Sequence, residues 1–399
     1  MRTNKISDRV PVSRCTSCPV QLNCTRRIRS LLLSGMPVAR NSTRQRTPVG
    51  AGPRIWTPTN QYTPGRFTWP LNYCREGSQE PESDYNHMFQ VIEEETARFK
   101  ATEEGKKFWG LRMIWTSLRF LDSRSIVESM DSCIATKLAW PHLVAGYDLV
   151  GAEDDGRPLA DLLPELFWFR KQCAMEGVEI PFFFHAGETL GDGDATDDNL
   201  FDALLLGTRR IGHGFSLYKH PRLIEAVRDR RILIESCPIS NEILRLTGSI
   251  MHHPLPALLA RGVACALCND DPAILGQDTA GMTHDFWQTL QGWDNLGLAG
   301  LGSLAENSVR WSVFEDQDSE TWYAFLHPYP GQPQIVPSWR DEIELTRDRL
   351  KDIRAASIGG GVKAERLRQW AVEWEQYCLW IVTEYGEQYG DKVDEDAAQ

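Results

Sequence analysis

Short apolar runs alternate with longer amphipathic stretches from about Tyr85 onward. The runs are apolar nearly throughout, which is typical of strands in a parallel sheet buried on both faces. Six runs predict strands: GLRMIWTSLRF (110–120), HLVAGYDLVG (142–151), IPFFFHAGE (180–188), RRIGHG (209–214), RILIESCP (231–238) and VACALCNDD (263–271). Helical spacing of apolar residues predicts helices between the runs, for example in DDNLFDALLLGT, HPRLIEAVRDR and HPLPALLARG, and another over 87–109, HMFQVIEEETARFKATEEGKKFW.

This alternation predicts an α/β fold in which helices cover a parallel sheet. The polar side chains that are capable of chemistry follow the carboxyl ends of the strands, where a (β/α)8 barrel of the TIM type opens its active site. A doubly wound sheet also binds ligands beyond its strand ends. A barrel is favoured because no glycine-rich turn follows the first predicted strand and the reactive residues are spread over at least four strands. Six strands are two fewer than a closed barrel needs.

The two ends of the chain differ from its middle. Residues 1–80 are rich in Arg, Ser, Thr, Pro and Gly without a sustained period, which predicts a basic disordered arm. Such a composition is also typical of organelle transit peptides. Residues 81–399 are predicted to form the barrel domain, with a helical tail from Trp339 onward that packs outside it. The expected packing face of the tail consists of Trp370, Trp374, Cys378, Ile381 and Tyr385.

Charge separates the arm from the rest of the chain. Residues 1–70 hold eleven Arg and one Lys against the single acid Asp8, so the net charge of −12 leaves a strongly acidic body. An acidic body argues against nucleic acid as a partner and favours a small-molecule substrate. No apolar run has the length of a membrane span, and the start lacks the apolar core and cleavage pattern of a secretory signal.

The ten cysteines are scattered rather than dense, which does not indicate a disulfide scaffold. One class of zinc-dependent nucleobase deaminases requires H-x-E followed by P-C-x-x-C. Here two residues separate His185 from Glu188, and Ala264 rather than proline precedes the pair Cys265 and Cys268. The sequence therefore excludes that class.

Chemically capable side chains gather at the ends of consecutive predicted strands: His185 and Glu188 in HAGE, His213 in GHG, and Asp270 and Asp271 in NDDP. Each has a plainer interpretation when taken alone, as a buried core histidine or a loop cap. Together they predict a metal hydrolase site, because imidazole and carboxylate suit zinc and a zinc-bound water loses its proton readily. Glycines beside His213 and Glu188 leave the backbone bare where a ligand would approach.

Five motifs in this order resemble the adenosine deaminases of the amidohydrolase superfamily: DLVG (148–151), HAGET (185–189), RIGHGF (210–215), ESCPISN (235–241) and NDDP (269–272). The surrounding text, GYDLVGAEDDGRPL and FFFHAGETLGDG, is most similar to the growth-factor-related subfamily, whose members are commonly secreted. The resemblance covers about residues 105–315. It implies a zinc-dependent hydrolase that converts adenosine or 2′-deoxyadenosine to the inosine product and ammonia.

The resemblance also implies individual roles. His185 and Asp270 would bind one zinc ion, and Glu188 would protonate the purine ring nitrogen next to the attacked carbon. His213 would orient the metal-bound water and help to take its proton. Asp271 and the backbone of Gly151 would hold the purine by hydrogen bonds.

The chain departs from the family pattern at one point. The family's first barrel strand ends in a His-x-His pair that supplies two further zinc ligands, and no His-x-His occurs here. This agrees with a barrel that lacks its first two strands. Two interpretations stay open: an incomplete or misassembled form of a normal enzyme, or a relative that binds nucleosides or signals without turnover.

Substrate, location and assembly follow from the same reasoning. A deaminase of AMP would need basic residues for the phosphate, and the strand ends have few; Arg209 and Arg210 precede their strand and are expected on the opposite face. The resemblance implies a secreted protein, whereas the absence of a signal peptide favours the cytoplasm. No nucleic-acid or membrane partner is expected, and a homodimer is left open.

Overall fold

The computed structural model describes residues 53–54, 82, 84–271, 275–276, 281–293, 296–326 and 361–396. Apart from two residues, the predicted arm at 1–80 lies outside the described residues. So do 339–360, the first part of the predicted helical tail. The domain boundary at residue 81 stays a prediction.

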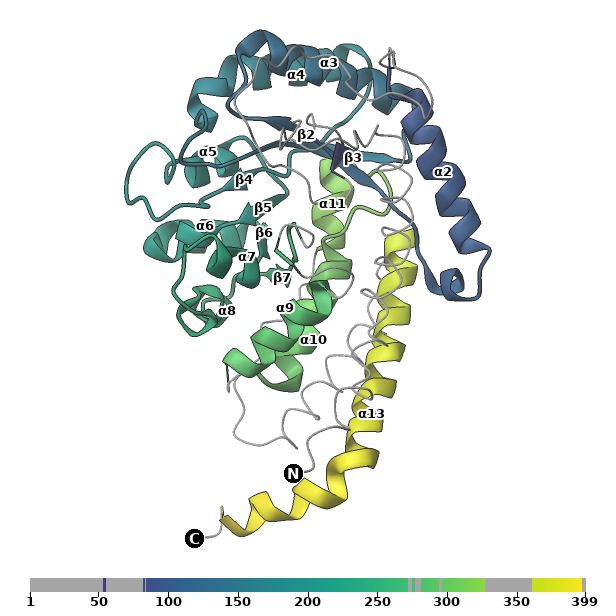
Figure 1. Cartoon of the computed structure of the whole chain (residues 1–399), viewed down its shortest axis with the longest axis vertical. Helices are drawn as coiled ribbons and strands as arrows, with labels where there is room; N and C mark the ends of the chain where they lie inside the picture. Colours follow the sequence, from purple (N-terminus) through teal and green to yellow (C-terminus); the bar gives the residue numbers. More distant parts are fainter. Residues whose placement is uncertain are drawn as a thin grey trace, which may run out of the picture.

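Six parallel strands follow one another in a curved array, as the sequence predicts (Figure 1). A bridge between Tyr147 and Phe182 joins its two hydrogen-bonded sheets. The array consists of β2 (Met113–Leu118), β3 (Val144–Val150), β4 (His185–Ala186), β5 (Arg210–His213), β6 (Leu233–Ser236) and β7 (Cys265–Leu267), and a short strand, β1 (Pro53–Arg54), pairs antiparallel with β2. The described chain is thus a partial (β/α) barrel.

Helices connect the strands and lie outside them. The predicted helices α5, α6 and α8 are confirmed. The α-helices are α2 (Asn86–Lys100), α3 (Ser123–Ala139), α4 (Leu163–Met175), α5 (Asn199–Leu205), α6 (Pro221–Asp229), α7 (Pro238–Ile243), α8 (Leu255–Ala260), α9 (Gly281–Gly292), α10 (Gly297–Arg310), α11 (Ser319–Phe325) and α13 (Val362–Asp396). The 3-10 helices are η2 (Glu104–Lys107), η3 (Leu159–Leu162), η4 (Phe215–Lys219) and η5 (Ile250–His252).

Neighbouring residues of a strand point to opposite sides, and this period of two separates two hydrophobic clusters. In β6, Leu233 belongs to the inner cluster and its neighbours Ile232 and Ile234 belong to the cluster beneath the outer helices. The inner cluster is Ile114, Ala145, Phe183, Leu233, Ala264, Ala266, Trp311, Val313, Trp322 and Leu326. Its bulky members after β7 fill the interior at the amino ends of the strands. The predicted site residues lie at the opposite end, which is formed by the carboxyl ends of the strands.

On each of the two outermost strands of the parallel array, some backbone groups of the outer edge are paired. β1 pairs with β2 at one end. At the other end, α10 packs beside β7, and the Asn307 side-chain amide donates a 2.8 Å hydrogen bond to the Cys265 carbonyl. Because an unpaired strand edge exposes backbone donors and acceptors, these contacts stabilise a barrel that is not closed by eight strands.

Two elements are shorter than their patterns predict. In IPFFFHAGE only His185–Ala186 forms a regular ladder, because the Phe184 amide donates to the Thr208 hydroxyl at 3.1 Å instead of to a neighbouring backbone carbonyl. The helix predicted over 87–109 ends at Lys100. There the Thr102 hydroxyl donates to the Phe99 carbonyl at 2.7 Å, and a 3-10 turn follows.

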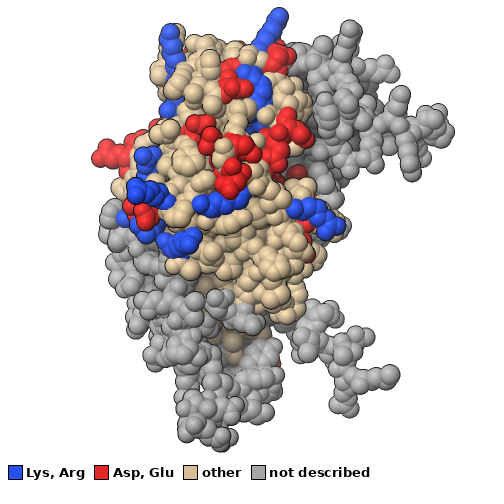
Figure 2. Space-filling view, turned by 90° about the vertical axis from the view of Figure 1, so that its left-hand side faces the viewer, with Lys and Arg blue, Asp and Glu red and all other residues tan. Residues whose placement is uncertain are grey.

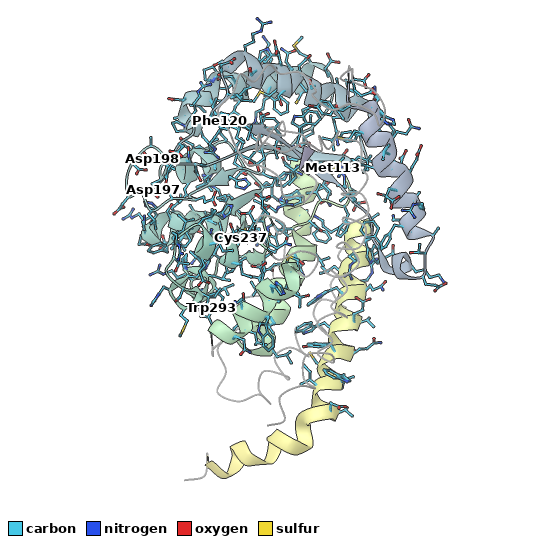
Figure 3. The ribbon with its side chains drawn as sticks, viewed as in Figure 1. Met113, Phe120, Asp197, Asp198, Cys237 and Trp293 are labelled. Atoms are coloured by element: carbon cyan, nitrogen blue, oxygen red, sulfur yellow. The ribbon has the colours of Figure 1, made fainter. Side chains whose placement is uncertain are left out.

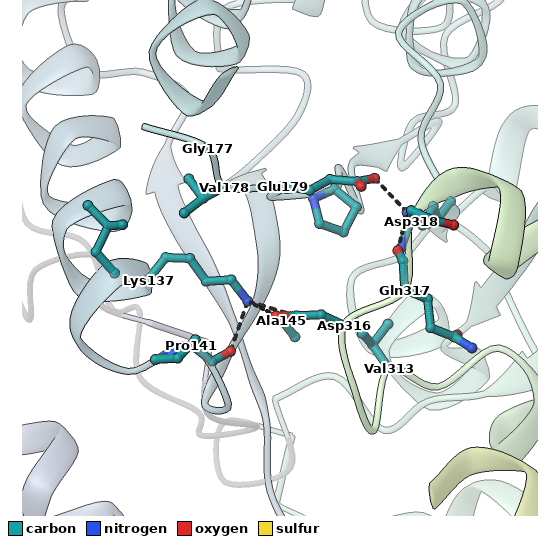
Figure 4. A pocket seen from close by; sticks show the side chains of 13 residues that line it. Lys137, Pro141, Ala145, Gly177, Val178, Glu179, Val313, Asp316, Gln317 and Asp318 are labelled. Carbon is teal, nitrogen blue, oxygen red and sulfur yellow. Dashed lines mark hydrogen bonds and ion pairs between the residues drawn. The ribbon is translucent and has the colours of Figure 1, made fainter. Parts of the chain in front are cut away.

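A pocket of about 290 Å³ lies at the amino ends of the strands, away from the predicted site (Figure 4). Four of its charged side chains form two ion pairs: Lys137 contacts Asp316 and Arg209 contacts Glu179, each at 2.8 Å. This end of a barrel typically serves stability rather than chemistry. Arg209 therefore lies on the face opposite to the site, as expected.

The tail helix α13 packs beside α10, which confirms the outer position expected for it (Figure 1). Trp370, Trp374 and Cys378 are buried there, as their spacing predicts, and Ile381 is partly buried. The Tyr385 side chain lies outside the described residues. No helix among the described segments is long and apolar enough to cross a membrane.

Candidate active site

The predicted site residues come from the carboxyl ends of the strands. Figure 3 places Phe120, which follows β2, on the same side of the molecule as Asp197 and Asp198, which follow β4, whereas Met113 at the start of β2 lies on the other side. Two of the predicted residues, His213 and Asp270, have left-handed backbones with φ of 62° and 52°. Residues other than glycine adopt this conformation rarely, and such strain concentrates at functional sites.

His185 is oriented by Asp148, a fully buried carboxylate on β3. Asp148 Oδ2 lies 2.8 Å from His185 Nδ1, and Asp148 Oδ1 accepts the His185 backbone amide at 2.9 Å. A carboxylate on Nδ1 fixes the proton there and leaves Nε2 as the electron-pair donor. This is the usual arrangement of a metal-binding histidine.

Glu188 is held by a second buried carboxylate, Glu153. Glu153 accepts the backbone amides of Gly187 at 3.0 Å and Glu188 at 2.7 Å. Arg119 Nη1 lies 3.6 Å from Glu153, and Arg119 Nη2 donates to the His185 carbonyl at 2.9 Å. The loop HAGE is therefore fixed from two sides, which sets the positions of both of its functional side chains.

His185, His213 and Asp270 bring one donor atom each within 4.8 Å of one another. His213 Nε2 lies 3.7 Å from Asp270 Oδ2, which also accepts the Ser240 hydroxyl at 2.7 Å. Imidazole and carboxylate are the usual donors of catalytic zinc sites, so His185 and Asp270 in this cluster fit a zinc ion. Among the described residues, this is the group of three that could hold a metal.

Glu188 faces this cluster, with Oε1 at 3.5 Å from His213 Nε2. Burial raises the pKa of Glu188 to about 7; His213 opposes the rise, and Asp270 adds to it. A carboxyl group with such a pKa is protonated for part of the time at neutral pH. It can therefore act as a general acid.

The raised pKa has a cost in stability that can be measured in the metal-free chain. The folded state holds the Glu188 proton more tightly than the unfolded chain, so stability falls as pH rises from about 4.5 to about 7. We expect Glu188→Gln to be more stable than the wild type above pH 7 by up to about 3 kcal/mol, and this pH-dependent difference to vanish below about pH 4.5. Urea unfolding at a series of pH values tests this.

The exposed Glu225 on α6 provides the matched control. Glu225→Gln should change stability by the same small amount at every pH. If the difference between Glu188→Gln and the wild type were equally independent of pH, the raised pKa would be refuted.

The structure brings four of the six predicted site residues together: His185, Glu188, His213 and Asp270. Gly151, with φ of 104°, follows β3. Asp271 follows Asp270 beyond β7. Both lie at the carboxyl ends of strands. Their expected contacts with a purine stay predictions.

Sequence reasoning missed several supporting residues. It quoted the motif DLVG for its glycine alone, although an aspartate within an apolar strand indicates a buried partner. Likewise, ESCPISN was quoted without a role for Ser240 or for its final asparagine, although Ser240 contacts Asp270. The partners that the structure reveals are Arg119, Asp148, Glu153, Ser240 and Asn241.

Charges on the face that carries the strand ends are mixed. Figure 2 looks onto this side, and on its described part lysine and arginine are interspersed with aspartate and glutamate, with acidic side chains grouped near the middle. A uniform basic area that would favour a phosphorylated substrate is not visible on this described surface.

Comparison with known proteins gives a consistent result. Residues 80–325 match the family model described as "Adenosine deaminase". Proteins named adenosine deaminase 2 are 39% identical over 246 residues in Sus scrofa and 38% identical over 225 residues in Homo sapiens, covering 60% and 56% of this chain. A protein named adenosine deaminase from Lutzomyia longipalpis is 36% identical over 266 residues, or 65% of this chain. The chain spans 47%, 43% and 48% of these three relatives, respectively.

Proposed function

The chain belongs to the adenosine deaminase family, and its similarity to proteins named adenosine deaminase 2 supports the growth-factor-related subfamily. From this premise, we propose that it catalyses the zinc-dependent hydrolytic deamination of adenosine or 2′-deoxyadenosine. The observation that carries the proposal is the convergence of His185 and Glu188 from the end of β4 with His213 from β5 and Asp270 from beyond β7. Oriented imidazole, carboxylate and a protonatable carboxyl group are what hydrolysis of an aromatic amidine requires.

In this proposal His185 and Asp270 hold the zinc ion. When bound, zinc supplies hydroxide at neutral pH by lowering the pKa of a coordinated water. The orientation of His185 by Asp148 supports this role, because Nε2 is left available as the donor atom. His213 lies between Glu188 and Asp270, where its Nε2 can orient the attacking oxygen.

Glu188 acts as the general acid. Attack on the amidine carbon of the purine moves electron density onto the adjacent ring nitrogen, and a protonated carboxyl stabilises that charge by donating its proton. The bond from the tetrahedral carbon to the amino nitrogen then breaks as the proton of the new hydroxyl group moves to that nitrogen, so ammonia leaves and the carbonyl group of inosine forms. We further infer that Asp271 and the Gly151 backbone hold the purine ring. The extracellular location, the homodimer and the absence of nucleic-acid and membrane partners stay predictions from the sequence.

The direct test measures turnover and metal content on one purified sample. We expect the absorbance of adenosine to fall as inosine forms, this activity to disappear after chelation and dialysis, and added zinc to restore it. AMP provides the comparison, because the mixed charges at the strand ends predict weaker turnover of a phosphorylated substrate. A folded sample that holds zinc but leaves adenosine unchanged would favour a nucleoside-binding relative over an enzyme.

A further inference from the structure

A chain of hydrogen bonds leads from the start of α8 to the active site. The Leu255 backbone amide donates to His253 Nδ1 at 3.1 Å, and His253 Nε2 lies 2.9 Å from Asn241 Oδ1. Asn241 Nδ2 lies 3.1 Å from His213 Nδ1. Asn241, His253 and His213 are all buried. Buried polar groups cost free energy unless they are paired, so each of these contacts constrains the next.

The direction of every hydrogen bond in this series follows from the first donor, the Leu255 backbone amide. A backbone amide can only donate, so His253 Nδ1 must accept, and the proton of the neutral ring must sit on Nε2. Asn241 Oδ1 then accepts that proton, which turns the Asn241 amide nitrogen toward His213. His213 Nδ1 must accept in its turn, so the proton of His213 sits on Nε2.

The surroundings of His253 keep it neutral. Its ring packs edge-on against Phe215 and near Trp293, with ring centroids 5.5 and 6.1 Å away. Burial lowers the pKa of His253 to about 3, and His213 adds to this effect. Leu255 is the first residue of α8, and the backbone amides of the first helical turn have no partner within the helix. The Leu255 amide is therefore available to donate to His253.

We propose that Asn241 and His253 are positioning residues that hold His213 as a neutral imidazole with its proton on Nε2, aimed at the attacking oxygen. In this tautomer His213 donates a hydrogen bond from Nε2, so it is neither a metal ligand nor the acceptor of the water's proton that the family resemblance implies. Its Nε2 then faces the carboxyl oxygens of Glu188 and Asp270, at 3.5 and 3.7 Å. The opposite tautomer would leave a lone pair on Nε2 and would make His213 a third metal ligand or a proton acceptor.

The tautomer can be read directly by NMR. In a chain labelled with ¹⁵N at histidine, long-range ¹H–¹⁵N correlations distinguish the two neutral tautomers and the imidazolium ion. We expect the proton of His213 on Nε2 with and without zinc. In Asn241→Asp, a carboxylate oxygen faces Nδ1 in place of the amide donor, so we expect the His213 proton to move to Nδ1 or the ring to become charged.

Activity supplies a second readout, which rests on the proposed function. We expect Asn241→Asp to keep its zinc and to change KM by less than about 3-fold, while kcat falls about 10- to 100-fold, the range seen when the partner of a site histidine is lost. His252→Gln is the matched control, because His252 is the exposed neighbour of His253 and lies outside this chain of bonds. It should leave both kcat and the His213 signals unchanged.

A wild-type His213 with its proton on Nδ1, or an unchanged tautomer in Asn241→Asp, would overturn the proposal. If Asn241→Asp does not fold, the wild-type spectrum alone decides. Failure of the proposed function looks different: a folded, zinc-loaded wild type would not turn over adenosine, yet its His213 tautomer would still be readable.

Discussion

Glu188→Gln is expected to abolish deamination, with kcat for adenosine falling about 10³-fold, within the range that general acid catalysis contributes. Glutamine keeps the shape of the side chain but has no proton to transfer to the ring nitrogen. The backbone contacts of Glu153 with the HAGE loop do not involve the Glu188 side chain, so the loop should keep its conformation. The loss of adenosine absorbance under saturating substrate measures the effect.

Two further measurements separate chemistry from structure in this variant. Zinc content should stay that of the wild type, because Glu188 is not one of the proposed ligands. The control Glu225→Gln on α6 should keep full activity. Turnover by Glu188→Gln within about 3-fold of the wild type would assign the general acid to another group.

Asp270→Asn is expected to remove most of the bound metal, with the affinity for zinc falling at least about 100-fold, beyond the usual effect of losing a supporting contact. Asparagine tolerates the left-handed backbone of this position, so the substitution removes the charge with little change in strain. Metal analysis after dialysis against a weak chelator measures the loss, and turnover should disappear with the metal.

Asp271→Asn is the natural comparison, because it neutralises the adjacent aspartate. If Asp271 holds the purine, this variant keeps its zinc and raises KM for adenosine. Equal loss of zinc from both variants would mean that the pair holds the metal by its combined charge, and the assignment of Asp270 as the ligand would fail.

The strands, their order and the end of the barrel that carries chemistry could be predicted because they depend on local patterns. Apolar runs predict buried strands, and His185, Glu188, His213 and Asp270 each follow or end such a run. Their convergence follows from parallel strands, whose carboxyl ends meet on one face of a barrel. The local details were less predictable. β4 is shorter than its run because side chains take two of the run's backbone amides: the Thr208 hydroxyl accepts that of Phe184 and Asp148 accepts that of His185.

The supporting residues could not be predicted, because their roles depend on which strands are neighbours. Asp148 contacts His185 only because β3 lies beside the segment leading into β4, and a single sequence does not state that register. The link from His253 to Asn241 joins residues twelve positions apart, across the end of α7, a turn and the 3-10 helix η5. Neither residue lies on a periodic pattern that would assign it a partner.

The left-handed backbones of His213 and Asp270 limit how this protein can evolve. Glycine is the residue that relieves such strain best, but at these two positions it would remove the side chains on which the site depends. Arg245 has the same backbone conformation, with φ of 66°, on an exposed turn, and its side chain has no proposed role in the reaction. A substitution of Arg245 by glycine can therefore relieve backbone strain without removing a proposed site residue. At His213 and Asp270 the strain of the left-handed backbone must persist for as long as the protein keeps these side chains for its reaction.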